Sequence, residues 1–193
     1  CLDRSDRNFS MGSKDLCGAA YLEELLRMGV SSLKIEGRMK TAYYLANVVK
    51  GYRYLIDCYY EKGTITDAEL LKGQQMIDQA ANRDTFPGFF PGHTDISGQM
   101  YNVTTAIPQN YVASVVSYDN GVATVEDRNY FQVGDQLAVM NPQGEDAEFI
   151  LDGMTDTEGN TVTVANKPMQ QLLIRVPVPV DRYSFIKSRQ VIK

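Results

Sequence analysis

The residues best suited to chemistry lie in the segment SSLKIEGRMK, residues 31–40. The middle of this segment has the composition of a short strand, and side chains alternate between the two faces of a strand. Leu33 and Ile35 would then point to one face, and Lys34 and Glu36 to the other. A lysine and a glutamate on an inner face could contact a polar substrate. Alternatively, the two charged residues pair with neighbouring residues in a satisfied interior ion pair.

Further charged residues lie close to this segment and at the end of the preceding predicted strand. Arg38 follows Glu36 by two residues, and Lys14 and Asp15 end the earlier strand. In an eight-stranded α/β barrel the active site lies at the C-terminal ends of the strands. The sequence therefore predicts a site at the barrel mouth with five candidate catalytic residues: Lys14, Asp15, Lys34, Glu36 and Arg38.

Cys17, in the stretch SKDLC, is the candidate metal ligand. A lone cysteine at the start of a helix is more often a small buried apolar residue, as we also expect of Cys58. The cysteines are widely spaced and form no CxxC pair, so a metal site at Cys17 would need ligands from outside this chain. The single histidine, His93, lies in a Gly/Pro-rich loop without an identifiable catalytic partner.

Strand and helix patterns alternate in the first part of the chain, which indicates a parallel sheet in an α/β arrangement. Thr66 and Glu69 form the capping box of one of these helices. The predicted elements are strands at 8–16 and 32–36 and helices at 19–29, 41–60 and 66–81. Two strand–helix units cannot close a sheet. We therefore expect residues 1–81 to be the C-terminal fragment of a TIM-like α/β barrel whose N-terminal portion lies outside this chain.

The pattern becomes all-β after a Gly/Pro-rich linker at 82–110. The pair Asn120–Gly121 separates two alternating apolar runs and predicts a tight hairpin turn. Further strands are predicted at 135–140, 147–151, 161–164 and 172–176. So many short strands within residues 111–193 suggest a small closed β-barrel. The predicted fold class is therefore α/β plus all-β.

The composition limits the classes of function. A net charge of −5 and a pI near 4.9 are unusual for a nucleic-acid binder, which normally has a basic surplus. Binding to RNA would need basic surface elsewhere or a local patch, for example Arg38, Lys40, Lys50 and Arg53. Three unevenly spaced cysteines indicate a reducing, cytoplasmic environment, and no apolar run is long enough to span a membrane. The sequence contains no phosphate-binding glycine motif and no serine-hydrolase motif.

Several segments together resemble the C-terminal portion of peptidase family U32, the collagenase-like proteins. These are SKDLC, SLKIEGRMK with the tyrosine-rich helix that follows, and the N-R-x-x-F pattern at 82–86. The stretch YFQVGDQLAVMNPQG, followed by EFILDGM and VPVP, is most similar to the branch of the family associated with tRNA hydroxylation. The resemblance covers nearly the whole chain.

The resemblance implies a parallel α/β barrel followed by a small β-barrel similar to domain 2 of elongation factors. It also implies oxygen-independent 5-hydroxylation of the wobble uridine of tRNA, linked to prephenate and to a 4Fe–4S cluster. Cys17 would be one cluster ligand, and the others would lie outside this chain. Lys34, Glu36 and Arg38 match the family's IEGR stretch and would line the barrel mouth.

Three functions follow as hypotheses. The first is the C-terminal part of a tRNA uridine hydroxylase, which we expect to be inactive without the rest of the barrel. The second is a peptidase, although the sequence suggests no nucleophile–base pair. The third is a non-catalytic module in which the β-domain binds RNA or another protein.

Overall fold

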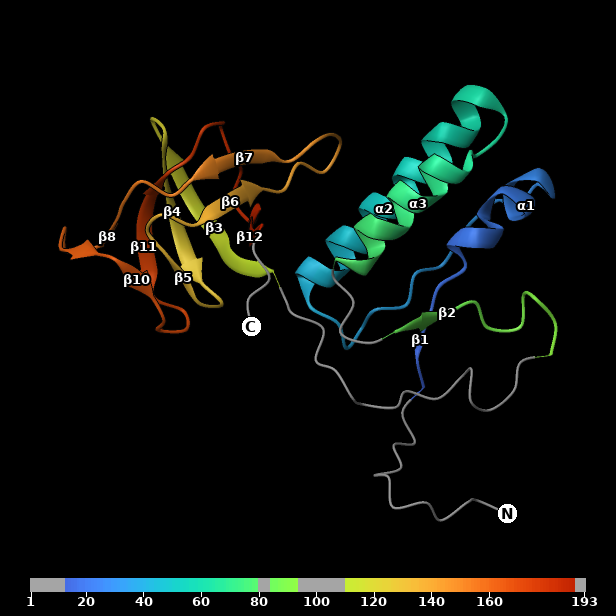
Figure 1. Cartoon of the computed structure of the whole chain (residues 1–193), viewed down its shortest axis with the longest axis horizontal. Helices are drawn as coiled ribbons and strands as arrows, with labels where there is room; N and C mark the ends of the chain where they lie inside the picture. Colours follow the sequence, from blue (N-terminus) through green and yellow to red (C-terminus); the bar gives the residue numbers. More distant parts are fainter. Residues whose placement is uncertain (1–12, 80–83, 94–109, 190–193) are drawn as a thin grey trace, which may run out of the picture. The chain divides into compact units, whose positions relative to one another are not determined.

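The computed structural model describes residues 13–79, 84–93 and 110–189, which form two compact units, Cys1–Ile107 and Pro108–Lys193 (Figure 1). The first part of the strand predicted at 8–16 lies outside the described residues. The same is true of Asn82, Arg83 and most of the predicted linker. No helix in the described part of the chain is long and apolar enough to cross a membrane.

The first unit consists mainly of helices. Its elements are β1 (Asp15–Leu16), the 3-10 helix η1 (Ala19–Tyr21), α1 (Leu22–Arg27), α2 (Ala42–Lys62), α3 (Asp67–Asp78) and β2 (Thr85–Phe86). The three predicted helices are confirmed within the described residues. Gly29, at a φ of 79°, follows the first helix, Thr41 caps α2, and Thr66 and Glu69 form the predicted capping box of α3.

The described part of this unit contains one parallel strand pair. β1 pairs with β2 in parallel, with Asp15 opposite Thr85 and Leu16 opposite Phe86. β2 belongs to the segment for which the sequence predicts a linker. In addition, the backbone N–H of Cys17 donates a hydrogen bond of 2.8 Å to the carbonyl of Phe86 in β2. The parallel direction agrees with the predicted arrangement, but two short strands do not make a barrel.

The strand predicted at 32–36 is wrong for the described structure. Residues 31–37 form no regular secondary structure, and the side chains of Leu33 and Ile35 remain 37% and 38% exposed. A strand needs a neighbouring strand to pair its backbone groups. Among the described residues no strand lies beside this segment, so its alternating pattern is not realised as a sheet.

Helices α2 and α3 lie side by side as an antiparallel pair (Figure 1). Gly51 and Gly73 are both buried where the helices meet. A Cβ on Gly51 would lie 2.9 Å from the carbonyl oxygen of Gly73 and 2.6 Å from Cγ1 of Ile77. A Cβ on Gly73 would lie 2.6–2.8 Å from the branched end of Leu55. The close approach of the two helices therefore requires glycine.

The second unit is a curled antiparallel sheet with a core of its own (Figure 1). Its strands are β3 (Tyr111–Asp119), β4 (Val122–Asp127), β5 (Phe131–Gln132), β6 (Gln136–Val139), β7 (Ala147–Ile150), β8 (Met154–Asp156), β9 (Thr161–Val162), β10 (Val164–Ala165), β11 (Gln171–Arg175) and β12 (Phe185–Ser188). In the described residues, eight of these pair in the order β7-β6-β12-β3-β4-β11-β8-β9, and β5 pairs with β10. Leu137 of β6 and Met154 of β8, distant in this order, share one core, so the sheet curls around it.

The predicted hairpin is confirmed. β3 and β4 are joined at Asn120 and Gly121, whose φ values of 46° and 90° are those of a type I′ turn. The four further predicted strands each have a counterpart, although the one at 161–164 is divided into β9 and β10. Sequence reasoning missed β5, β8 and β12. β5 and β8 are only two or three residues long, and β12 is stabilised by pairing with β3 and β6, which are distant in sequence.

A buried ion pair lies in this second unit. Nζ of Lys187, on β12, is 2.5 Å from Oδ2 of Asp146 in the β6–β7 connection, and the lysine side chain is almost fully buried. The other carboxylate oxygen of Asp146 accepts a hydrogen bond from the backbone N–H of Asn141 at 3.1 Å. The pair therefore joins β12 to the loop between β6 and β7.

Replacing Gly51 with alanine tests the helix contact. We expect Gly51→Ala to lower the free energy of unfolding by about 1–3 kcal/mol, because the new methyl group overpacks a contact with backbone. This loss outweighs the ~1 kcal/mol that alanine gains over glycine in a helix. Urea unfolding followed by helical circular dichroism measures it. Gln75→Ala, at an exposed position of α3, is the control, and equal stabilities would show that the helices do not need this glycine.

Removing the carboxylate of the buried pair tests how much this ion pair stabilises the second unit. Asp146→Ala removes a carboxylate in contact with the buried Lys187 ammonium and should cost about 3 kcal/mol of stability. The control is Glu148→Ala, which breaks the exposed pair between Glu148 and Arg189 (3.1 Å) and should cost less than ~1 kcal/mol. Denaturant unfolding monitored by tyrosine fluorescence compares the two variants, and a cost at Asp146 no larger than at Glu148 would contradict the analysis.

Candidate functional site

A cavity of about 480 Å³ in the first unit is the candidate site, and we call it the groove. It lies between α1, α2, β1 and residues 33–36. Its walls are largely apolar, and polar groups enter from Asp15, Lys40, Tyr44 and Tyr52. The lining residues are Asp15, Leu16, Gly18, Leu22, Leu25, Leu33, Lys34, Ile35, Glu36, Lys40, Tyr44, Val48, Val49, Tyr52, Arg53, Ile56 and Phe90.

Helix α2 supplies one wall of the groove because it has apolar side chains on two faces. The buried face includes Gly51 and Leu55, at the contact with α3. The second face includes Val49 and Ile56, which line the groove, and Val49 is 51% exposed. The apolar side chains of α2 are therefore divided between a helix contact and an open cavity.

Asp15 is the centre of a polar cluster at one part of the groove. Its Oδ2 lies 2.5 Å from Nζ of Lys40 and accepts a hydrogen bond of 3.1 Å from the hydroxyl of Tyr44. The Lys40 ammonium also lies 4.6 Å from the centre of the Tyr44 ring. Burial, together with the negative charge of Asp15, raises the pKa of Tyr44 to about 12. The phenol therefore stays protonated at neutral pH and donates to the carboxylate.

Tyr52 and Cys17 form a second polar contact beside this cluster. The Tyr52 hydroxyl accepts a hydrogen bond of 3.0 Å from the backbone N–H of Gly18 and lies 3.8 Å from Sγ of Cys17. The thiol donates to Oε1 of Gln74 at 3.5 Å. Burial raises the pKa of Tyr52, so this hydroxyl also stays protonated.

Cys17 does not make a metal site by itself. The described residues contain no group of three or more histidine, cysteine, aspartate or glutamate side chains placed to hold a metal ion. The Cys17 thiol is buried, and its contacts are the hydroxyl of Tyr52 and the amide of Gln74. An iron–sulfur cluster needs several thiolates. The residues described here therefore do not constitute a cluster site.

The predicted site residues are only partly brought together. Lys34 and Glu36 line the groove, but both face solvent, with side chains 83% and 69% exposed and a 3.3 Å ion pair between them. Their expected position on an inner strand face is therefore not seen, since the segment is not a strand. The backbone N–H of Arg38 donates to Oε1 of Glu36 at 3.2 Å. Neither Arg38 nor Lys14 is among the lining residues, whereas Asp15 is.

Sequence reasoning missed Lys40, Tyr44 and Tyr52 as members of the site. Lys40 lies just before the Thr41 cap of α2 and Tyr44 lies in the first turn of the helix, so no helical spacing rule links the two residues. Their contact with Asp15, 25 and 29 residues earlier in the chain, is tertiary and leaves no local pattern. Cys58 is buried, as expected, and His93 is exposed in the described part of its loop.

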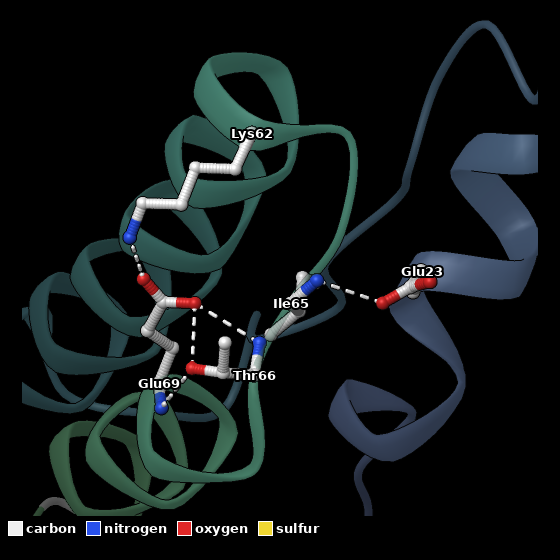
Figure 2. Close-up of polar contacts among 5 residues, drawn as sticks. All are labelled: Glu23, Lys62, Ile65, Thr66 and Glu69. Carbon is white, nitrogen blue, oxygen red and sulfur yellow. Dashed lines mark hydrogen bonds and ion pairs between the residues drawn. The ribbon is translucent and has the colours of Figure 1, made fainter.

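Helix α1, which forms another wall, is held in place by Glu23 (Figure 2). The Oε2 atom of Glu23 accepts a hydrogen bond from the backbone N–H of Ile65 at 2.7 Å and another from the hydroxyl of Thr64 at 3.1 Å. Both donors lie in the α2–α3 connection. The hydrogen bond from the Ile65 backbone is the main reason that the pKa of Glu23 lies below its ordinary value. This contact ties α1 to the helix pair and so helps to define the groove.

Glu69 holds the α2–α3 connection itself (Figure 2). Its carboxylate forms an ion pair with Lys62 and accepts hydrogen bonds from the backbone N–H and the hydroxyl of Thr66, at 3.0 and 2.8 Å. The Lys62 contact and then the Thr66 contacts lower the pKa of Glu69 to about 2. The junction therefore depends on an ionised glutamate.

Comparison with known protein families gives two matches that together cover most of the chain. Residues 2–100 match the family described as Peptidase family U32. Residues 108–187 match the domain described as Peptidase family U32 C-terminal domain. The groove belongs to the first of these regions, and the curled sheet to the second.

Individual relatives agree with these matches. The chain is 34% identical over 170 residues to tRNA hydroxylation protein P1 of Bacillus subtilis and 36% identical over 176 residues to tRNA hydroxylation protein P of Escherichia coli. These alignments cover 86% and 90% of this chain but only 40% and 37% of the relatives. The chain thus spans about two fifths of their length.

More distant likenesses also occur. A protein of Porphyromonas gingivalis named Collagenase is 24% identical over 147 residues, covering 71% of this chain and 39% of that protein. Among solved structures, the C-terminal domain of a Geobacillus thermoleovorans protein described as a U32 peptidase aligns with a TM-score of 0.40 and 28% identity. That alignment covers 42% of this chain and 93% of the solved domain.

Acid unfolding of the first unit tests the role of Glu69. Its pKa is lower in the folded than in the unfolded chain, so its stabilisation is present above the unfolded pKa, near 4.3, and is lost as the pH falls towards 2. We expect Glu69→Gln to melt below the wild type at pH 7, with the difference shrinking between pH ~4.5 and ~2. Melting temperatures followed by helical circular dichroism measure it.

The control for this experiment is Glu61→Gln, at an exposed position near the end of α2. It removes one negative charge from the same region without touching the α2–α3 connection. A difference in melting temperature between Glu69→Gln and the wild type that stays constant from pH 7 to 2 would refute the assignment.

Proposed function

The chain belongs to peptidase family U32, and we propose that it forms the C-terminal part of a protein that hydroxylates tRNA. The observation that carries this proposal is the similarity to two proteins named for tRNA hydroxylation, each at more than 30% identity over more than four fifths of this chain. Because the chain spans about two fifths of those relatives, the activity belongs to the longer protein. By itself the chain is expected to be inactive.

In the detailed form of the proposal, the reaction is oxygen-independent 5-hydroxylation of the wobble uridine, carried out in the cytoplasm. The family resemblance implies that this reaction uses prephenate and a 4Fe–4S cluster. Cys17 would contribute one thiolate to the cluster and the remaining ligands would come from elsewhere in the longer protein. Cys17 would have to exchange its contacts with Tyr52 and Gln74 for such a ligand role.

The proposed architecture is a parallel α/β barrel that the preceding part of the longer protein completes. Two features support it. The β1–β2 pair is parallel, and residues 31–37 present Leu33 and Ile35 without a neighbouring strand among the described residues. A strand pairing with this segment would cover both side chains. The second unit would then be the β-barrel resembling domain 2 of elongation factors and would hold or orient the RNA.

The negative charge of the chain restricts where RNA can bind. A net charge of −5 disfavours a broad phosphate-binding surface on this chain, because it repels the RNA backbone. Lys34 and Arg38 near the groove are the cations best placed to contact RNA, and we assign the remaining contacts to the rest of the longer protein. In the completed barrel, Lys34 would lie near an anionic group of the substrate, and Glu36 and Arg38 would line the barrel mouth.

A peptidase is the second candidate, favoured by the similarity to the Porphyromonas gingivalis collagenase. Peptide hydrolysis by a cysteine needs a base in contact with the thiol. The contacts of Cys17 are Tyr52 and Gln74, which are not bases, and His93 is exposed in its loop. We therefore rank this function below tRNA hydroxylation. Gelatin cleavage by the longer protein, abolished by one point mutation, would reverse the ranking.

Complementation tests the proposed function and its site residues together. In cells lacking the gene, the longer protein should restore hydroxylated wobble uridine, measured by mass spectrometry of tRNA nucleosides. Glu36→Ala and Arg38→Ala should each lower that product at least ~10-fold if they act at the reacting group. Glu61→Ala, an exposed glutamate outside the groove, should leave it unchanged.

The two outcomes of complementation have separate meanings. Failure of the wild-type longer protein to restore the modification contradicts the function itself. Full restoration by both alanine variants contradicts only the role given to Glu36 and Arg38.

A further inference from the structure

Residues 31–37 have no regular secondary structure, so their position depends on the contacts made at the two ends of the segment. At the first end, the backbone N–H of Val30 donates to the carbonyl of Leu25 at 3.2 Å. At the second end, the backbone N–H of Lys40 donates to the carbonyl of Gly37 at 2.9 Å, which closes a turn over residues 37–40. We call these four residues the charged turn.

Gly37 brings the charged turn close to the first part of α2. A Cβ at this position would lie 2.2 Å from Cδ2 and 3.2 Å from Cγ of Leu45. Leu45 lies in the early part of the helix, and its side chain would have to move to admit even a methyl group. The backbone of the charged turn is therefore packed directly against α2.

Lys40 connects the charged turn to the strand pair. Its Nζ lies 2.5 Å from Oδ2 of Asp15 on β1, and the two side chains are only 23% and 15% exposed. The hydroxyl of Tyr44 donates to the same oxygen at 3.1 Å. Water screens a half-buried pair of this kind much less than an exposed pair. The Lys40 side chain thus fixes the end of the charged turn to a strand 25 residues earlier in the chain.

Arg38 lies inside the charged turn, and its side chain is exposed. Its backbone N–H donates to Oε1 of Glu36 at 3.2 Å, so the path of the backbone is determined on both sides of Arg38. In the described part of the chain, the Arg38 guanidinium forms no ion pair and no hydrogen bond. A guanidinium has five N–H donors in a fixed plane, which suit a carboxylate, phosphate or carbonyl group of a ligand. The charged turn therefore presents this cation to solvent.

We propose that Lys40 is a positioning residue for Arg38, because its ion pair with Asp15 holds the charged turn where Arg38 can reach the substrate of the proposed hydroxylation. Tyr44 supports Lys40 by orienting the Asp15 carboxylate. Lys40 and Tyr44 do not touch the substrate in this arrangement, and both act through the position of the Arg38 guanidinium. The inference rests on the proposed function and adds to it the two side chains that hold Arg38 in place.

The charged turn lies outside the surface that the rest of the barrel would cover. In the proposed architecture a strand of the longer protein pairs with residues 31–37 and covers Leu33 and Ile35. Arg38 follows that segment and so lies beyond its C-terminal end, the edge at which barrel enzymes hold their reacting groups. Arg38 would therefore stay accessible to a ligand after the barrel is complete.

Hydrogen exchange of the 193-residue chain, measured by NMR, tests whether Lys40 holds the charged turn. We expect the backbone amides of residues 38 and 40 to exchange at least ~10-fold faster in Lys40→Met, because the turn opens without the ion pair. The amide of Leu55, which is buried in α2, should keep its wild-type rate and shows that the helix is intact. The control is Asp57→Asn, which breaks the exposed Arg53–Asp57 pair on the same helix and should change no rate in the charged turn.

A double-mutant cycle in the longer protein tests whether Lys40 acts through Arg38, with hydroxylated uridine in tRNA as the readout. Lys40→Met should lower the product about 10-fold, since a small displacement of a group at the reacting centre has a large effect on rate. In an Arg38→Ala background the same change should lower the product less than ~2-fold, because Lys40 then has no guanidinium to position. Tyr44→Phe should show the same dependence on Arg38 with a smaller loss of ~3-fold. It keeps every charge of the cluster, so it serves if Lys40→Met does not fold.

Two results overturn the proposal. One is exchange at residues 38 and 40 that is the same in Lys40→Met and the wild type. The other is a loss of product from Lys40→Met, or from Tyr44→Phe, that is equally large with and without the Arg38 side chain. If the wild-type longer protein does not hydroxylate tRNA at all, the proposed function is wrong, and hydrogen exchange alone decides whether Lys40 holds the charged turn.

Discussion

Helix α2 has apolar side chains on two of its faces, and the packing of other elements against these faces organises the first unit. One face closes against α3, where Gly51 and Gly73 allow the helices to approach until backbone meets backbone. With that contact made, α3 cannot also cover Val49 and Ile56 on the second face. Helix α1 and residues 33–36 approach this face without filling the space, and the groove results.

The polar part of the groove is arranged around a carboxylate that holds its neighbours in place. Asp15 comes from the parallel strand pair, Lys40 from the connection before the Thr41 cap of α2, and Tyr44 from the first turn of α2, so their contact joins the strand pair to the helix. Half-buried pairs of this kind retain more of their Coulomb attraction than exposed pairs do, because water screens them less. The exposed Lys34–Glu36 pair, in contrast, contributes little stability and leaves both side chains able to change partners.

The second unit depends on its own core. The strands of its curled sheet enclose one cluster of buried side chains, and the buried Lys187–Asp146 pair joins β12 to the β6–β7 loop. Asp127 is also buried there, and one of its carboxylate oxygens lacks a hydrogen-bond partner in the described residues. Burial raises its pKa, which favours the protonated form that needs less solvation.

Local signals in the sequence determined the helices, their caps at Thr41 and Thr66, and the Asn120–Gly121 hairpin, because these depend on residues a few positions apart. Three features were decided only by tertiary structure. The alternation at residues 32–36 predicts a strand, but a strand exists only beside a partner. Which apolar residues of α2 contact α3 and which line the groove depends on where the other elements of the unit pack. The meeting of Asp15 with Lys40 and Tyr44 joins residues at least 25 positions apart, a distance at which side-chain spacing along the chain carries no information about contact.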